Sequence, residues 1–256
     1  MMKPFKLPYR VALAGGLSAA AVGLIVGTLW STARRIGGKT PLSPGALAGG
    51  AIVTGISFAV RYYWPLQRRL GSAAVYLTFD DGPDPEVTPI ILDALAEYHG
   101  HGTFFVLGAS VEKHPDLTAR IEREGHTIGI HGYHHHAVTL QAPRTIGRDL
   151  DQTLAAFRAA GASGLIRLYR PPYLLRGPGL GTALRARGLR MTLLTLDSHD
   201  YLSRSPDPIR QRLAERLQAG DIVVLHDEGE TGRATAAAIR GILKDMEQKG
   251  LRSRAL

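Results

Sequence analysis

The chain has 256 residues, of which 45% are hydrophobic, and its formal net charge at neutral pH is +9. This length fits one globular domain of ordinary size with an appendage. The sequence contains no cysteine, which excludes disulfide bonds, a thiolate nucleophile and a cysteine-ligated zinc ion.

The excess positive charge is confined to the N-terminal part of the chain. Residues 1–70 contain nine Lys and Arg and no Asp or Glu, whereas residues 71–256 contain 22 basic and 22 acidic residues. A nucleic-acid-binding domain concentrates basic residues on its folded surface, and the balanced charge of residues 71–256 argues against that class. We therefore expect no nucleic-acid partner, and we interpret the basic residues as flanks of membrane segments.

Two uncharged segments within residues 1–70 predict a membrane anchor. Residues 11–30 are twenty residues without a charge, and at about 1.5 Å per residue a helix of this length crosses a hydrocarbon core of about 30 Å. A cleaved signal peptide is the alternative, but the apolar run is long for one. Residues 45–60 are shorter, so a second transmembrane helix and a helix lying at the interface fit equally well.

The charges around these segments do not fix the topology, because the two flanks and the loop between them each carry three Lys or Arg. One span with a cytoplasmic N-terminus would place the rest of the chain outside, and two spans would return it to the starting side. We expect residues 71–256 to form a domain that is anchored to the membrane and lies outside the cytoplasm.

From residue 73 onward, short apolar runs alternate with segments of helical spacing. In the helical segments apolar residues recur three or four apart, for example at Ile146, Leu150, Leu154 and Phe157. This alternation predicts parallel strands joined by crossover helices, hence an α/β fold. The number of units indicates a small or incomplete barrel, and an open doubly wound sheet is the alternative. The expected strands are residues 74–79, 103–107, 126–131, 165–169, 189–196 and 221–226, and the expected helices are centred on residues 90–95, 117–121, 146–157, 209–217 and 239–246.

Ionisable side chains follow nearly every expected strand. In α/β folds, ligands bind at the C-terminal ends of the strands. A single charged residue in such a loop is ordinary, but charges at five strand ends together indicate a site. These residues are Asp80 and Asp81, His131, Arg170, Asp197 to Asp200, and His226 with Asp227.

The stretch "HGYHHH" at residues 131–136 suggests a metal site. His131 and His135 are four apart, a spacing at which two imidazoles on one helical face chelate one metal, and His131 with His134 would also fit. Two His and one carboxylate form an open site for a divalent cation. If Asp81 is the third ligand, Asp80 is free to act as a base toward water.

Two adjacent carboxylates do not both ionise easily unless positive charge lies nearby. A metal ion and Arg170 would provide that charge. His226 could donate a proton to a leaving group, and Asp200 could orient that imidazole and adjust its pKa.

The same residues carry a resemblance to a known family. Over about residues 73–256, the chain resembles the polysaccharide deacetylases of carbohydrate esterase family 4, the NodB-homology domain. The five motifs of that family correspond in order to "TFDDGP" at 78–83, "HGYHH" at 131–135, "RPPY" at 170–173, "DSHDY" at 197–201 and "VVLHD" at 223–227.

The resemblance implies a distorted (β/α)7 barrel, with the C-terminal "LRSRAL" as a last short strand. It implies that Asp80 is the general base and that Arg170 holds it in place. It implies that the backbone amide of Tyr173 helps to form the oxyanion hole, and that His226 is the general acid, tuned by Asp200. The metal ligands it implies are Asp81, His131 and His135.

The metal is expected to be zinc, with cobalt, nickel or manganese as alternatives. The implied reaction removes acetyl groups from N-acetylated amino sugars, or from O-acetylated sugars, of an envelope or extracellular polysaccharide of the peptidoglycan or chitin kind. In the reaction that the resemblance implies, water activated by the metal would attack the acyl carbon, and the metal and the oxyanion hole would stabilise the oxyanion.

The chain departs from the family pattern at three places. Gly132 replaces a Ser or Thr whose hydroxyl steadies the metal loop, Tyr201 replaces a Trp that lines the acetyl pocket, and no Gly follows "RPPY". Two other functions stay open: hydrolysis of another non-peptide C–N bond on the same metal site, as relatives of this fold carry out, and glycan binding without catalysis, which Gly132 and Tyr201 support. The sequence identifies neither the sugar nor the oligomeric state.

Overall fold

The computed structural model describes residues 69–162, 164 and 166–256. The expected membrane segments, residues 11–30 and 45–60, lie outside the described residues. None of the helices in the described part of the chain combines the length and the apolar character that crossing a membrane requires. The folded unit includes residues just before the expected boundary, since the Leu70 N–H donates to the Gly220 carbonyl at 2.9 Å.

Seven parallel strands form one sheet in the order β5-β4-β3-β2-β1-β7-β6. This is the cyclic order of a barrel that is opened between β5 and β6, so the α/β barrel is confirmed in an incomplete form and the doubly wound alternative is wrong. The strands are β1 Tyr76–Asp80, β2 Thr103–Val106, β3 Thr127–Ile130, β4 Leu168–Tyr169, β5 Arg190–Met191, β6 Leu196–Asp197 and β7 Ile222–His226.

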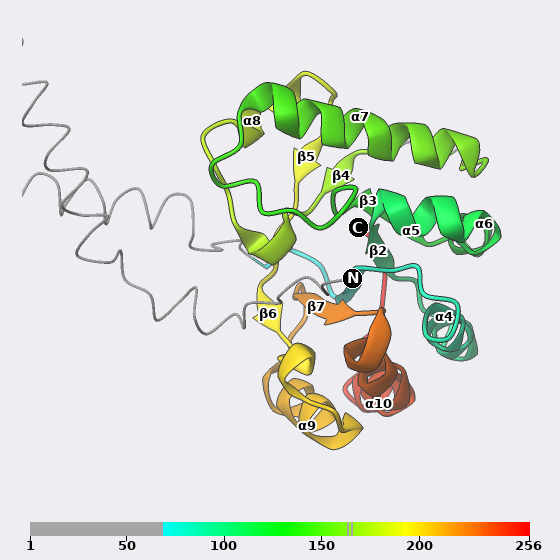
Figure 1. Cartoon of the computed structure of the whole chain (residues 1–256). Coiled ribbons are helices and arrows are strands. Elements are labelled where there is room, and N and C mark those ends of the chain that lie inside the picture. The colour runs from blue at the N-terminus through cyan, green and yellow to red at the C-terminus, as the bar shows by residue number, and fades with distance from the viewer. Residues whose placement is uncertain (1–68, 163, 165) are drawn as a thin grey trace, which may run out of the picture. The chain divides into compact units, whose positions relative to one another are not determined.

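The helices lie outside the strands (Figure 1). Each expected helix is present, and two short helices, α5 and α8, are additional because six residues are too few to show a clear apolar period. The helices are α4 Thr88–Glu97, α5 Gly108–Lys113, α6 Pro115–Arg123, α7 Pro143–Ala159, α8 Leu180–Arg185, α9 Pro206–Arg216 and α10 Gly229–Gln248, with the 3₁₀ turns η1 Pro172–Leu174 and η2 Asp200–Leu202.

The central strands are buried on both faces, which explains why they read as continuous apolar runs rather than as alternating ones. Leu77 and Phe79 of β1 are fully buried, and the Phe79 ring stacks on Phe104 of β2 at 4.9 Å between centroids. On the outer layer, α7 turns Ile146, Leu150 and other apolar residues toward this core. The apolar periodicity of the sequence therefore reports burial correctly.

The apolar run at 189–196 forms two short strands instead of one. At its start the Thr192 N–H donates to the Tyr169 carbonyl of β4 at 2.8 Å, and near its end the Thr195 N–H donates to the Ile222 carbonyl of β7 at 2.9 Å. One extended segment thus bonds first to one edge of the sheet and then to the other. It crosses the gap between β5 and β6, where the barrel is not closed by strand pairing.

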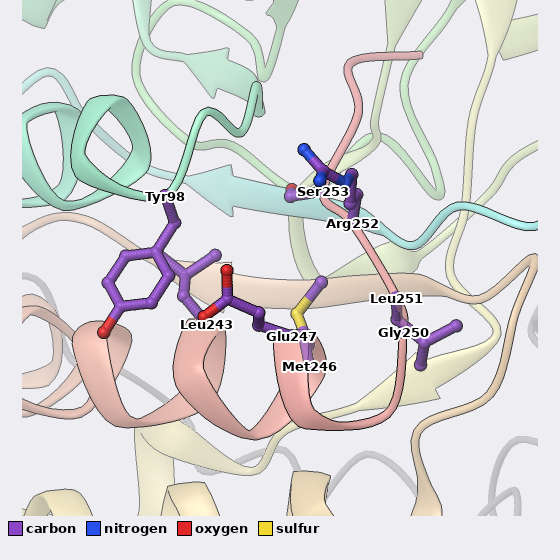
Figure 2. A pocket seen from close by; sticks show the side chains of 8 residues that line it. All are labelled: Tyr98, Leu243, Met246, Glu247, Gly250, Leu251, Arg252 and Ser253. Atoms are coloured by element: carbon purple, nitrogen blue, oxygen red, sulfur yellow. The ribbon is translucent and has the colours of Figure 1, made fainter.

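The C-terminal segment lies at the opposite end of the barrel from the C-terminal ends of the strands. The expected last strand is reduced to a single bridge between Val75 and Ser253. A cavity of about 220 Å³ lies beside this bridge, lined by Tyr98, by the last turn of α10 and by residues 250–253 (Figure 2). The cavity is therefore remote from the ionisable residues that follow the strands.

Asp221 stabilises the gap between β5 and β6, and we predict that its removal destabilises the fold. Its buried carboxylate accepts hydrogen bonds from Thr195 Oγ1 at 2.7 Å, Gln218 N at 2.9 Å and Arg69 Nε at 2.6 Å. Asp221→Ala removes a buried acceptor and its three hydrogen bonds, and urea denaturation should show a loss of about 1–3 kcal/mol in the free energy of unfolding.

Glu97→Ala is the control, because Glu97 forms only an exposed ion pair with Arg240. This substitution should change the free energy of unfolding by less than about 0.5 kcal/mol. If Asp221→Ala costs no more than Glu97→Ala, Asp221 does not stabilise the gap.

Candidate active site

The adjacent carboxylates Asp80 and Asp81 point to different partners because the chain turns sharply between them. Asp80 is the last residue of β1, and Asp81 takes a left-handed backbone conformation with φ of 83°. The following turn is held by Asp227, whose Oδ1 accepts the Gly82 N–H at 3.0 Å. A Cβ at Gly82 would lie 2.2 Å from Asp227 Oδ2, so only glycine fits.

Asp81, His131 and His135 form a cluster that fits a divalent metal. The Nε2 atoms of His131 and His135 lie 3.5 and 3.3 Å from Asp81 Oδ1, and one donor atom from each of the three residues lies within 4.8 Å of the others. Asp81 Oδ1 is buried and has no hydrogen-bond partner. A buried oxygen left unsatisfied is costly, and a cation among these three donors would satisfy it.

The two imidazoles converge from a loop and not from a helix, so the expected helical face is wrong. Residues 131–135 have no regular secondary structure, and His135 has a φ of 59°. His134, the alternative ligand in the sequence pattern, is exposed and packs edge-on against Tyr133 with 4.5 Å between ring centroids. The loop selects His135 over His134 as the second imidazole of the cluster.

His131 is held in the form that binds a metal. Its Nδ1 lies 2.8 Å from the Arg170 carbonyl, which can only accept, so Nδ1 carries the proton and Nε2 is left as a donor atom toward Asp81. Burial, together with the neighbouring His135, lowers the pKa of His131 to about 3. The ring is therefore neutral at physiological pH, as metal ligation requires.

Arg170 is fully buried and holds Asp80 in place. Its guanidinium donates to Asp80 Oδ1 at 2.7 Å, to Thr78 Oγ1 at 2.6 Å and to the Leu193 carbonyl at 2.9 Å, and it lies 4.1 Å from the centroid of the Phe105 ring. Burial raises the pKa of Asp80 above its ordinary value, and the charges of Arg170 and His226 offset this only in part. Asp80 is thus a carboxylate with an increased affinity for a proton.

His226 ends β7 directly beside Asp80, its partner in the strand register. Its Nδ1 lies 2.8 Å from Asp200 Oδ1, while its backbone N–H and the Thr235 hydroxyl both donate to Asp200 Oδ2 at 2.7 Å. Burial by itself lowers the pKa of His226, but the Asp200 carboxylate and the more distant Asp81 and Asp80 raise it to about 10. His226 is therefore protonated at neutral pH.

Tyr173 and Tyr201 lie on two sides of these groups. Tyr173 is in η1, in a left-handed conformation with φ of 57°, and its ring packs edge-on against His135 at 4.4 Å. The Tyr201 ring packs edge-on against His226 at 5.9 Å, and its hydroxyl donates to Asp197 Oδ2 at 3.1 Å. Tyr201 thus packs at the site as its position in the fourth motif leads one to expect.

All eight residues singled out in the sequence come together at this end of the barrel. Three further residues, to which sequence reasoning gave no role, support them: Asp227 under the Gly82 turn, Thr235 on Asp200, and Thr78 on Arg170. Asp227 was already among the charges that follow the strands, and it stands within the fifth motif. Thr235 carries no such signal, because it lies inside α10 and only tertiary packing brings it to Asp200.

Known proteins are similar to this chain in sequence and in fold. Residues 67–192 match the family model described as polysaccharide deacetylase. The chain is 31% identical over 180 residues to the peptidoglycan-N-acetylglucosamine deacetylase of Bacillus cereus. The matched residues cover 70% of this chain and 84% of the relative. It is 33% identical over 157 residues to a chitooligosaccharide deacetylase of Sinorhizobium fredii, covering 61% and 73% of the two chains.

A solved structure shows the same similarity at the level of the fold. The family 4 carbohydrate esterase of Streptomyces lividans, in complex with acetate, matches with a TM-score of 0.65 and 31% identity, over 72% of this chain and 92% of that one. The motifs, the open barrel and these relatives agree: the chain belongs to the polysaccharide deacetylase family, the NodB-homology enzymes of carbohydrate esterase family 4.

Proposed function

We propose that the protein removes acetyl groups from the N-acetylated amino sugars of an envelope or extracellular polysaccharide, of the peptidoglycan or chitin kind. The observation that carries the proposal is the convergence of the three candidate ligands, Asp81, His131 and His135, beside Asp80 and His226. The relatives named for peptidoglycan and for chitooligosaccharides support the substrate class.

A divalent cation held by Asp81, His131 and His135, with zinc expected first and cobalt, nickel or manganese as alternatives, would supply Lewis acidity at the scissile amide. Asp80 would accept the proton of the attacking water. Its raised pKa increases its affinity for that proton, and the hydrogen bond from Arg170 keeps the carboxylate oriented for the transfer.

His226 would complete the reaction by protonating the leaving nitrogen. Its pKa of about 10 keeps it protonated at neutral pH, and the contact of its Nδ1 with Asp200 leaves Nε2 as the nitrogen that would donate to the substrate. The backbone amide of Tyr173 is our candidate for the donor that stabilises the oxyanion of the tetrahedral intermediate.

Catalysis is favoured over simple glycan binding because the site contains a base and an acid in different environments. Burial raises the pKa of Asp80, while a buried carboxylate partner raises the pKa of His226. A binding module has no need for a proton acceptor and a proton donor next to each other, whereas hydrolysis of an amide requires both.

The direct test is acetate release from N-acetylglucosamine oligomers and from peptidoglycan by the purified protein, with and without added zinc or cobalt. Asp80→Asn should lower kcat by about 10²- to 10⁴-fold, because the proton acceptor is lost. The same variant should still bind the metal, since Asp80 is not among the proposed ligands. The metal content is measured on the same samples.

Three outcomes would contradict parts of the proposal. Absence of acetate release from every acetylated glycan, in a folded and metal-loaded protein, would contradict the reaction. Metal loss in Asp80→Asn would contradict the division of roles between the two carboxylates. Release of another amine from a different C–N substrate would identify the alternative hydrolase.

The dependence of activity on pH tests the acid. Activity requires Asp80 deprotonated and His226 protonated, so it should fall as the pH decreases through the pKa of Asp80 and again as it increases through the pKa of His226. A bound dication favours the deprotonated form of both groups. It therefore shifts both the acidic limb and the basic limb of the pH–activity profile to lower pH. Asp200→Asn removes the charge that raises the pKa of His226, so the basic limb should move further down by at least about one unit.

Asp93→Asn is the control for this experiment, because Asp93 forms an exposed ion pair with Arg120. Its pH profile should match that of the unchanged protein. A basic limb that stays in the same place in Asp200→Asn would show that His226 is not the acid whose pKa Asp200 sets.

We further propose that the domain works outside the cytoplasmic membrane. The uncharged segments at residues 11–30 and 45–60 and the peptidoglycan relative support this location. Protease added to intact spheroplasts should then digest the domain, while a cytoplasmic control protein survives. Protection of the domain until the membrane is lysed would place it in the cytoplasm.

A further inference from the structure

Residues 131–135, here named the metal loop, carry two of the three proposed ligands without a regular secondary structure to hold them. Part of the support comes from the beginning of α5. The Gly108 N–H donates to the Gly132 carbonyl at 3.0 Å, and the Ala109 N–H donates to the Tyr133 carbonyl at 3.2 Å. These bonds hold the carbonyl side of the loop but leave the Tyr133 N–H to be satisfied from elsewhere.

Asp149 of α7 satisfies that N–H. Its Oδ2 accepts the hydrogen bond from Tyr133 N at 3.0 Å across sixteen residues of sequence. The same oxygen would lie 3.3 Å from a Cβ at position 132, so the carboxylate rests directly against Gly132. A helix that is anchored in the core thus fixes the middle of the loop.

Gly132 fits this arrangement and cannot be replaced freely. Its φ of 90° is a conformation that side-chain-bearing residues rarely adopt, and the Asp149 carboxylate occupies the space beside it. In the family pattern a Ser or Thr hydroxyl at this position steadies the loop. This chain has Gly132 there, and Asp149 holds the backbone of the loop.

We infer that Asp149 is a positioning residue for the metal loop: it fixes the Tyr133 amide so that the imidazoles of His131 and His135 converge on Asp81. The inference rests on the metal site of the proposed function. Groups that orient ligands without touching the metal typically contribute about 10- to 100-fold to metal affinity, because a loop that is not held in place must be ordered when the metal binds. Asp149 is such a group, because it holds the loop backbone at the Tyr133 N–H and is not among the proposed ligands.

The test compares Asp149→Ala and Asp149→Asn in the full-length protein. Asp149→Ala removes the acceptor and should weaken zinc and cobalt binding by about 10- to 100-fold. Asp149→Asn keeps an amide oxygen toward the Tyr133 N–H and should bind within about threefold of the unchanged protein. Affinity is measured by chelator competition, and the cobalt absorption spectrum and the melting temperature of the metal-free protein are recorded beside it.

Asp151→Ala is the matched control. Asp151 lies on the same helix but forms only an exposed ion pair with Arg187, so its loss should leave metal affinity unchanged. If the Asp149→Ala protein is folded and binds metal as tightly as the unchanged protein, the inference is overturned. If Asp149→Ala does not fold, Asp149→Asn decides: retained affinity supports the acceptor role, and a tenfold loss contradicts it.

The result is separate from the fate of the proposed function. If the unchanged protein binds no metal, the metal site itself is wrong. If the unchanged protein binds metal and Asp149→Ala binds it equally well, only the role of Asp149 is wrong.

Discussion

The buried ion pair between Arg170 and Asp80 is the interaction on which the rest of the site depends. A fully buried guanidinium costs several kcal/mol unless its charge is paired and its N–H groups find acceptors. Arg170 meets most of this requirement by bonding through its two terminal nitrogens to Asp80 and Thr78 of β1 and to the Leu193 carbonyl in the gap of the barrel, while its buried Nε has no hydrogen-bond partner. Its own backbone carbonyl accepts a hydrogen bond from Nδ1 of His131. One residue therefore orients the proposed base and sets the tautomer of a proposed ligand.

The site separates groups of similar chemistry by giving them different surroundings. Asp80 and Asp81 are neighbours in sequence, yet the turn at Asp81 directs one carboxylate to Arg170 and the other to the two imidazoles. His131 and His226 differ in the same way, because burial lowers the pKa of the first while a buried carboxylate raises the pKa of the second. A neutral ligand and a charged proton donor can thus be built from the same side chain.

The open barrel contributes to this arrangement. Because β5 and β6 do not pair with each other, the Leu193 carbonyl in the segment between them accepts a hydrogen bond from Arg170. In a closed barrel this carbonyl would be used in a strand ladder. At the other end of the gap, the hydrogen bond between Thr195 and Asp221 stabilises the fold. The segment between β5 and β6 therefore contributes both to the stability of the fold and to the geometry of the site.

The apolar periodicity of the sequence by itself predicted the strand-helix alternation, and its short motifs, through the family that they resemble, implied the seven-strand barrel and the eight residues of the candidate site, because periodicity and motifs are local properties of the chain. It did not determine that residues 189–196 divide between two edges of the sheet, nor that residues 131–135 form a loop instead of a helix. Nor could it reveal Asp149 and Thr235, which look like ordinary polar residues of α7 and α10. Only the tertiary structure decided these points. A hydrogen bond between distant residues depends on the neighbours that packing brings together, and the local sequence does not encode those neighbours. The same holds for a pKa shift caused by burial.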